Sequence, residues 1–176
     1  PDYIDSIQNF YRVFSGIDNK SANATELFLK TIIYTTNYPL TRLGNTNATE
    51  LAKVLENSYR AMNIAFVTEW SRFAEESEVN LYEVVDAIRM RPTHSNLMYP
   101  GIGVGGYCLT KDPLLASWAK QNHFNSNEPL IQSENGVKTN DKMPLFAFEF
   151  MKRAFNLVDL KKTKVAFLGV SYRSNV

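Results

Sequence analysis

The longest regular pattern of apolar and polar positions lies between residues 47 and 76, a stretch without proline or glycine. At 100° per residue, its large apolar side chains fall on one stripe. They are Leu51, Leu55, Tyr59, Met62, Phe66, Trp70 and Phe73. The pattern predicts a long amphipathic helix with this stripe on its core side. Lys53, Asn57 and Arg60 share a narrow arc on the opposite side.

Weaker patterns predict further helices. Asn23 and Glu26 have capping-box spacing, which predicts a short helix over 23–34. After a break at residues 79 and 80, a helix is expected over 81–89. Asp112 as N-cap and Pro113 as first helical residue predict a helix to about 121, and more helix is expected over 129–156.

Both ends of the sequence indicate strands. Residues 11–17 (YRVFSGI) are typical of a strand that closes an upstream unit. Residues 164–172 (KVAFLGVSY) are typical of the first strand of an α/β domain. We therefore expect a piece of a longer protein, with residues 1–20 and 157–176 as remnants of flanking domains around a central helical domain at 21–156. The alternative is a complete protein with frayed ends.

The composition excludes several classes of protein. The chain has 176 residues, 44% of them hydrophobic, which suffices for one globular core. Its 19 basic and 18 acidic residues are scattered, so no nucleic-acid surface is indicated. The apolar runs are too short to span a bilayer, and no membrane association is expected. A single cysteine, Cys108, excludes an intramolecular disulfide and fits a reducing compartment, so we expect a cytoplasmic protein.

The segment at residues 91–111 is irregular and holds four of the eight glycines. The glycines at 101, 103 and 106 match G-x-G-x-x-G, but no strand precedes them, so this is not a dinucleotide fingerprint. Glycines do allow a ligand to approach the backbone closely next to the Cys108 thiol. The nearby Lys111 and a helix start would both favour a thiolate.

Each of these candidates also has an ordinary structural interpretation. A lone cysteine such as Cys108 is often a small buried hydrophobe. Asp112 is expected to be an N-cap, a role that does not exclude a second one as a base. Lys53 and Asn57 would most often belong to a solvated helix face.

Three blocks in this order and spacing are far more specific than any single motif. They are residues 48–75 (ATELAKVLENSYRAMNIAFVTEWSRFAE), 101–113 (GIGVGGYCLTKDP) and 164–172 (KVAFLGVSY). Together they make the chain resemble the UDP-glucose/GDP-mannose dehydrogenase family. Lys53 and Asn57 match that family's catalytic lysine and asparagine in A-E-x-x-K-x-x-x-N, with Thr49 in place of the alanine. Cys108 matches its nucleophile, and Asp112 the aspartate four residues later.

The resemblance implies a mainly α fold, the helical central domain of a 6-phosphogluconate-dehydrogenase-like type between two Rossmann-like domains. It implies a four-electron oxidation of a nucleotide sugar, with NAD as hydride acceptor and Cys108 forming a thiohemiacetal and then a thioester. NAD would be bound mainly by the N-terminal domain that this chain lacks. Without that domain, the chain alone is expected to be inactive, and a homodimer through the helix at 47–76 is implied.

The resemblance also suggests residues that contact the substrate. Arg91, or else Arg89, is similar to the arginine that in this family precedes the glycine loop, which in this chain is the segment at residues 100–107. The other candidates are Tyr99, Gly105, Gly106 and Lys111. Val104 and Pro113 resemble the enzymes for UDP-N-acetylhexosamines, which favours UDP-N-acetylmannosamine or UDP-N-acetylglucosamine over UDP-glucose.

Two other functions compete with this interpretation. The first is a non-catalytic helical dimerisation module in which Cys108 is a core residue. The second is a thiol-dependent hydrolase, for which His94 and His123 are the only histidines and neither has an evident orienting partner.

Overall fold

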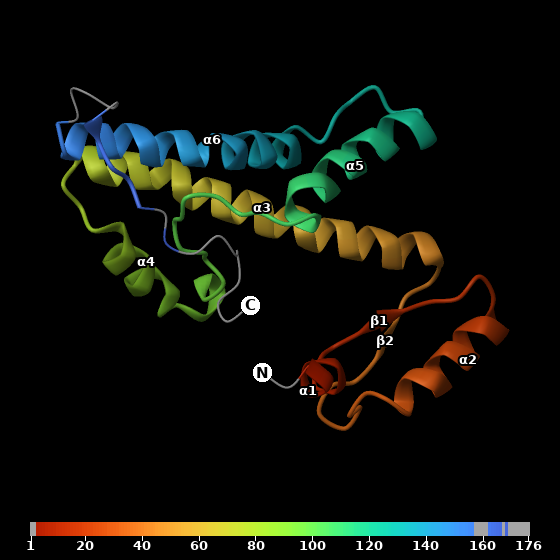
Figure 1. The fold of residues 1–176 in the computed structure, drawn as a ribbon. Coiled ribbons are helices and arrows are strands. Elements are labelled where there is room, and N and C mark those ends of the chain that lie inside the picture. Colours follow the sequence, from red (N-terminus) through yellow and green to blue (C-terminus); the bar gives the residue numbers. More distant parts are fainter. Residues whose placement is uncertain (1–2, 157–161, 167, 169–176) are drawn as a thin grey trace. The chain divides into compact units, whose positions relative to one another are not determined.

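The computed structural model describes residues 3–156, 162–166 and 168. In these residues the protein is mainly helical, as predicted (Figure 1). The chain divides into two compact units, Pro1–Leu55 and Glu56–Val176. The helix α3 (Thr46–Glu76) crosses from one unit into the other. The domain boundaries expected from the sequence stay predictions.

The first unit is a small α/β assembly. Its elements are α1 (Tyr3–Gln8), β1 (Val13–Phe14), α2 (Asn19–Lys30) and β2 (Thr41–Arg42). The two strands pair in parallel, with Val13 opposite Thr41. The strand expected over 11–17 is thus only two residues long. Parallel strands need a crossover, and α2 supplies it.

Helix α2 begins earlier than its sequence pattern suggested. Asp18 is the N-cap: its carboxylate accepts a hydrogen bond from the Ser21 amide at 2.7 Å, and the Ser21 hydroxyl completes a capping box. The box expected at Asn23 and Glu26 is therefore wrong, and the helix ends at Lys30 instead of residue 34. Glu26 instead pairs with Lys30 at 2.6 Å one turn later.

The second unit packs the remaining helices around α3. They are α4 (Leu81–Arg89), the 3-10 turn η1 (Pro92–His94), α5 (Cys108–His123) and α6 (Ile131–Ala154). Helix α3 has the predicted length, and Asn45 caps its first turn by accepting from the Ala48 amide at 2.9 Å. Helix α4 has the predicted bounds, with Asn80 as its N-cap.

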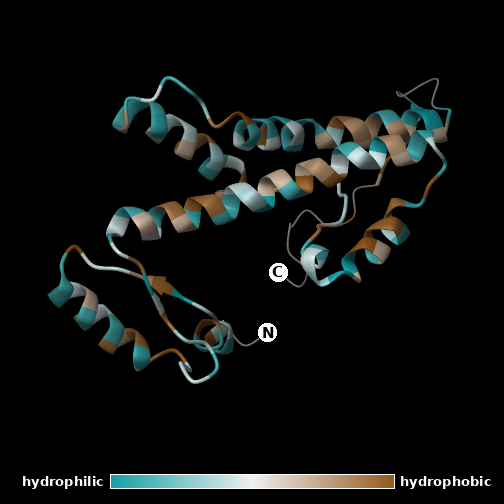
Figure 2. Cartoon of the chain, turned by 180° about the vertical axis from the view of Figure 1, so that it is seen from behind, coloured by the Kyte–Doolittle hydropathy of each residue, from teal (hydrophilic) through white to brown (hydrophobic). Residues whose placement is uncertain are grey.

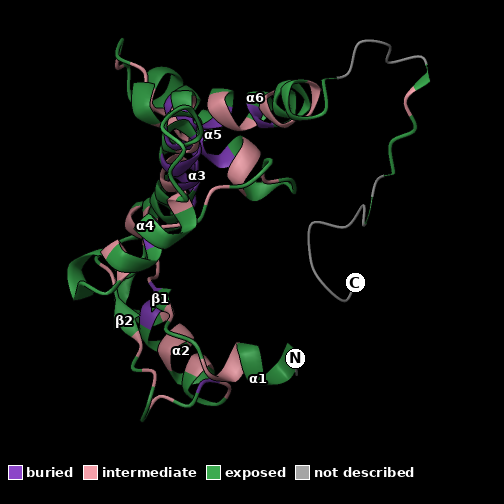
Figure 3. Ribbon diagram, turned by 90° about the vertical axis from the view of Figure 1, so that its left-hand side faces the viewer, coloured by how far each residue is buried: buried purple, intermediate pink, exposed green. Residues whose placement is uncertain are grey.

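Helices α3 and α6 approach each other at Gly136, which is buried. A Cβ atom at this position would lie 3.3 Å from the backbone of Met62, so a larger residue would push the helices apart. Ile64, Ala65 and Met143 form the core beside this crossing. Figure 3 shows the buried residues gathered where α3, α5 and α6 meet.

The apolar stripe of α3 does not face this core. Leu51 and Leu55 in the first unit are exposed, and so are Tyr59, Phe66, Trp70 and Phe73 in the second. Figure 2 shows hydrophobic and hydrophilic residues alternating along α3. The buried face instead carries small and medium side chains: Asn57, Ser58, Ala61, Ile64, Ala65, Val67, Thr68 and Ala74. Small residues let α6 pack closely, so the large stripe is left uncovered.

Two further sequence expectations concern the C-terminal part. Helix α6 confirms the helix expected over 129–156. The strand expected over 164–172 lies mostly outside the described residues, and those that are described, 164–166 and 168, have no regular structure. Across the described residues, no helix is long and apolar enough to cross a membrane.

Candidate functional site

Cys108 is the first residue of α5, and its thiol is exposed. The amide groups of the first helical turn have no intrahelical acceptors, and they place partial positive charge at this end of the helix. The Lys111 ammonium lies close enough to Cys108 for a charge interaction. The exposure of Cys108 contradicts its interpretation as a core residue.

Asp112 lies one turn after Cys108 and is buried. One carboxylate oxygen accepts a hydrogen bond from the Asn57 amide at 2.6 Å, and the other accepts from the Lys111 ammonium at 2.6 Å. The hydrogen bond to Asp112 raises the pKa of Lys111 above its ordinary value. Asn57, Lys111 and Asp112 therefore form one connected network beside the thiol.

The structure corrects the role expected for Asp112 at the helix start. Helix α5 begins at Cys108, so Asp112 is its fifth residue and Pro113 lies inside the helix. Proline disfavours helical backbone at the preceding residue. Here the bonds from Asn57 and Lys111 hold Asp112 in place, and the helix extends a full turn upstream of the proline.

Asn57 is not part of a solvated helix face, because it is 2% exposed and bonded to Asp112. Lys53 is exposed and belongs to the first unit. The expectation that Lys53 faces Cys108 therefore stays a prediction.

The glycine loop leads directly into Cys108. The described residues directly before its first glycine, 95–100, contain no strand, so the glycine pattern lacks the βαβ context of a dinucleotide fingerprint. Gly103 and Gly106 have φ angles of 121° and 85°, which other residues rarely adopt. A Cβ at Gly105 would meet nothing within 4 Å, so a ligand has room to approach the backbone there.

The residues before the loop are tied to α4. The Tyr99 hydroxyl donates to Asp86 at 2.5 Å, and its ring stacks on Tyr82 with 5.9 Å between centroids. Arg89 lies over the Tyr99 ring at 4.7 Å and donates to the Leu97 carbonyl at 3.2 Å. Arg89 and Tyr99 are thus engaged in support of the loop. Arg91 is exposed, so of the two arginines it is the better candidate for contact with a ligand.

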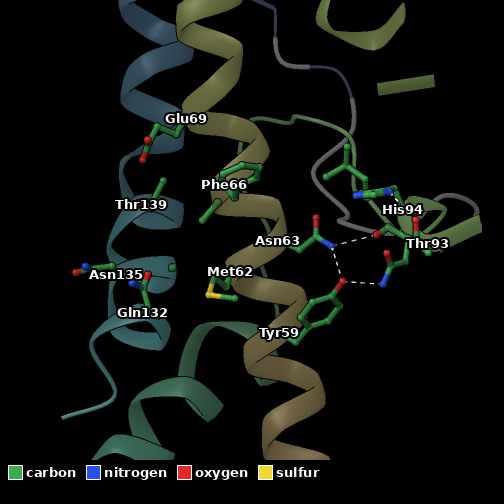
Figure 4. A pocket seen from close by; sticks show the side chains of 14 residues that line it. Tyr59, Met62, Asn63, Phe66, Glu69, Thr93, His94, Gln132, Asn135 and Thr139 are labelled. Atoms are coloured by element: carbon green, nitrogen blue, oxygen red, sulfur yellow. Dashed lines mark hydrogen bonds between the residues drawn. The ribbon is translucent and has the colours of Figure 1, made fainter. Parts of the chain in front are cut away.

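A cavity of about 410 Å³ lies in the second unit, but none of the candidate catalytic residues lines it (Figure 4). Its walls include Met62 and Phe66 of the apolar stripe, of which Phe66 is exposed and Met62 half-buried. On one side, Asn63 donates to the Tyr59 hydroxyl at 3.3 Å and to the Asn96 carbonyl at 3.1 Å. The cavity therefore belongs to the exposed face of α3 and not to the thiol site.

The two histidines have other partners. The His94 ring nitrogen Nδ1 lies 2.9 Å from the Thr93 hydroxyl, and the His123 ring meets Trp118 edge to face. Neither contact concerns Cys108, so the hydrolase interpretation gains no support. Among the described residues, no group of three or more histidine, cysteine or acidic side chains could hold a metal ion.

Sequence reasoning did not single out Asn140 of α6. Its amide accepts from the Val104 amide at 2.7 Å and donates to the Val104 carbonyl at 3.0 Å. It lies 36 residues from the loop it contacts, and an asparagine within a helix has no distinguishing pattern. Only the fold reveals this pairing.

Comparisons with known proteins agree with the fold and with the sequence motifs. A model of the central domain of the UDP-glucose/GDP-mannose dehydrogenase family matches residues 47–141, more than half of the chain. The UDP-N-acetyl-D-mannosamine dehydrogenase of Methanocaldococcus jannaschii is 34% identical over 165 residues, covering 94% of this chain and 35% of that protein.

Two solved structures resemble the chain closely. The UDP-D-ManNAc dehydrogenase of Pyrococcus horikoshii matches with a TM-score of 0.76 and 27% identity, over 94% of this chain and 37% of that one. The UDP-N-acetyl-mannosamine dehydrogenase of Staphylococcus aureus has a TM-score of 0.72 and 25% identity, over 98% and 37% of the two chains. The predicted fold class is confirmed, and the chain spans about a third of the length of these relatives.

Proposed function

This chain belongs to the UDP-glucose/GDP-mannose dehydrogenase family, and from that premise we propose that it supplies the thiol site of a nucleotide-sugar 6-dehydrogenase. The observation that carries the proposal is the exposed Cys108 at the start of α5, beside the buried Asn57–Asp112 pair. The reaction converts the sugar hydroxymethyl group at C6 to a carboxylate.

In this proposal Cys108 is the nucleophile. In the first oxidation the C6 hydroxymethyl group loses one hydride to the oxidant and one proton from its hydroxyl, which gives the C6 aldehyde. The Cys108 thiolate then adds to the aldehyde carbon: a carbon–sulfur bond forms, the carbonyl π bond breaks, and the former carbonyl oxygen takes up the negative charge as a thiohemiacetal. Loss of hydride from C6 then gives a thioester, and water releases the acid and returns the thiol. The start of α5 and the Lys111 ammonium stabilise the negative charge on sulfur or oxygen.

Asp112 and Asn57 have supporting roles in the same steps. The Asp112 carboxylate accepts a proton from water during thioester hydrolysis, since it lies one turn from Cys108 on the same face of α5. The Asn57 amide fixes that carboxylate at 2.6 Å. We assign Lys53 as a second cationic donor to the C6 oxygen, following the family motif.

The proposed oxidant is NAD, which would accept the hydride at each of the two oxidations. The described residues do not fit an NAD site of the Rossmann kind, because the glycine pattern at 101–106 follows no strand and opens no βαβ unit. No residue of this chain is therefore assigned to the cofactor.

We propose UDP-N-acetylmannosamine as the substrate, with UDP-N-acetylglucosamine as the next candidate. The named relatives from Methanocaldococcus jannaschii and Pyrococcus horikoshii are dehydrogenases of the former. Arg91, Lys111 and the backbone at Gly105 and Gly106 are the proposed contacts for the sugar, and Tyr99 supports the loop that presents them.

We further propose a homodimer through α3. Phe66, Trp70 and Phe73 form a connected aromatic row, with ring centroids 6.1 and 5.9 Å apart, and all three are exposed. An exposed apolar row of this length favours association. A second copy is the expected partner, because a two-fold axis lets the same row cover itself.

The experiment that tests the function is an assay of NADH formation by the full-length protein. The panel is UDP-N-acetylmannosamine, UDP-N-acetylglucosamine, UDP-glucose and GDP-mannose. We expect turnover of a UDP-N-acetylhexosamine, with two NADH formed for each sugar acid. One NADH for each sugar, or no reaction with any member of the panel, would contradict the proposal.

A further inference from the structure

Asn140 pairs with the glycine loop as a neighbouring β-strand would. Its side-chain oxygen accepts from the Val104 N–H at 2.7 Å, and its side-chain nitrogen donates to the Val104 carbonyl at 3.0 Å. One amide side chain thus satisfies both backbone groups of a single residue. The Val104 side chain packs against the core formed by Ile64, Ala65 and Met143.

The rest of the loop has few comparable attachments among the described residues. The Pro100 carbonyl accepts from the Tyr82 hydroxyl at 3.3 Å, and the Gly106 carbonyl accepts from the Thr110 hydroxyl at 2.7 Å. A Cβ at Gly101 or Gly105 would meet nothing within 4 Å, so neither residue is packed against another element. In the middle of the loop, Gly103 lies against α6, where a Cβ would meet Asn140, Met143 and Pro144 at 3.7 Å. Val104 is the loop residue whose two backbone groups are both bonded to α6, through Asn140.

We propose that Asn140 is a positioning residue for the thiol site, an inference that rests on the proposed function. By fixing Val104, Asn140 keeps the backbone of Gly105 and Gly106 in one position relative to the Cys108 sulfur atom. The sugar can then contact the loop backbone while its C6 atom lies within reach of the sulfur. Asn140 itself touches no reacting atom.

The proposal predicts different effects on the reactivity of the Cys108 thiol and on the binding of the sugar, two properties that a general loss of structure would change together. Cys108 begins helix α5, whereas the Asn140 side chain bonds to Val104 in the loop before that helix. Without Asn140 the free thiol should react normally with a small alkylating agent. Binding of the sugar, which needs the loop, should weaken.

The test uses three variants of the full-length protein. Asn140→Leu removes both bonds to Val104. Asn140→Asp keeps the acceptor for the Val104 N–H but loses the donor, and it is close in volume should the leucine variant fail to fold. Asn135→Ala is the matched control, because Asn135 is exposed on the same helix.

We expect Asn140→Leu to raise the KM for the nucleotide sugar roughly tenfold or more, as loss of two neutral hydrogen bonds implies. The KM for NAD and the alkylation rate of Cys108 without substrate should stay at wild-type values. Hydrogen exchange at the Val104 amide should accelerate. Asn140→Asp should give values between those of Asn140→Leu and the wild type. Asn135→Ala should match the wild type in every measurement.

Three results would overturn the proposal. If hydrogen exchange at the Val104 amide were unchanged in Asn140→Leu, Asn140 would not be what fixes Val104. If exchange were faster but the KM for the nucleotide sugar stayed at the wild-type value, fixing Val104 would have no effect on the substrate. Parallel losses in both KM values and in the alkylation rate would leave only a structural role. Failure of the proposed function itself is distinguishable, because wild-type protein would then show no turnover with any sugar in the panel.

Discussion

Replacing Asn57 with alanine tests the polar network at its most buried bond. The Asn57 amide donates to the Asp112 carboxylate at 2.6 Å, and the two residues are 2% and 7% exposed, so water cannot easily replace the amide. A hydrogen bond to a charged group contributes about 1.5–3 kcal/mol. Alanine is the better helix former by roughly 0.5 kcal/mol, which offsets part of the loss. We therefore expect a destabilisation of about 2 kcal/mol.

The assay is urea unfolding followed by circular dichroism, with Arg60→Ala as the control. Arg60 is exposed on the same helix, and its substitution should change the free energy of unfolding by less than about 0.5 kcal/mol. If Asn57→Ala were as stable as Arg60→Ala, the buried pair would not exist as described, and the orientation of Asp112 would lose its physical basis.

Three further predictions concern packing, pH and association. In Gly136→Ala the new Cβ would press on the Met62 backbone at a cost of about 1–3 kcal/mol, and the better helix propensity of alanine offsets about 1 kcal/mol of that cost. The net destabilisation should reach up to about 2 kcal/mol. Gly101→Ala meets open space and should not destabilise the protein, and equal effects of the two variants in urea unfolding would contradict the close packing of α3 and α6. The raised pKa of Lys111 gives a stabilisation that is present below pH 10.5 and lost as the pH rises through the folded-state pKa. Lys111→Met should therefore show a weaker decline in alkaline stability than the wild type, and parallel pH profiles would refute this. Trp70→Glu should convert the proposed homodimer to a monomer in sedimentation experiments, and a dimer that persists in this variant would place the interface elsewhere.

The long-range periodicity of the sequence predicted some elements well. Helix α3 has neither proline nor glycine over 31 residues, and α4 begins at an asparagine cap after a short break, so local signals alone located both. The family motifs also predicted that Asn57, Cys108 and Asp112 belong to one site. The fold then joined Asn57 and Asp112 directly, although 55 positions separate them in sequence.

Local signals failed where tertiary contacts decided the outcome. Pro113 looked like the first residue of a helix. In the structure the helix begins one turn earlier, at Cys108, and two hydrogen bonds to Asp112 hold the residue before the proline in helical backbone. The large apolar stripe of α3 looked like a core face, but α6 meets the stripe at Met62, which is half-buried, and the other residues of the stripe stay exposed. The pairing of Asn140 with Val104 has no local signal, because nothing around Asn140 in the sequence marks it as the partner of a loop 36 residues away.

The central claim is that Cys108 captures the substrate covalently. Its most direct test is the replacement Cys108→Ser in the full-length protein, with NADH formation and nucleotide-sugar affinity measured on the same sample. We expect turnover to fall by at least about a thousandfold while the Kd for the sugar stays within about twofold of the wild-type value, because the thiol is needed for bond formation and not for affinity. Formation of the sugar acid at the wild-type rate by Cys108→Ser would contradict the account.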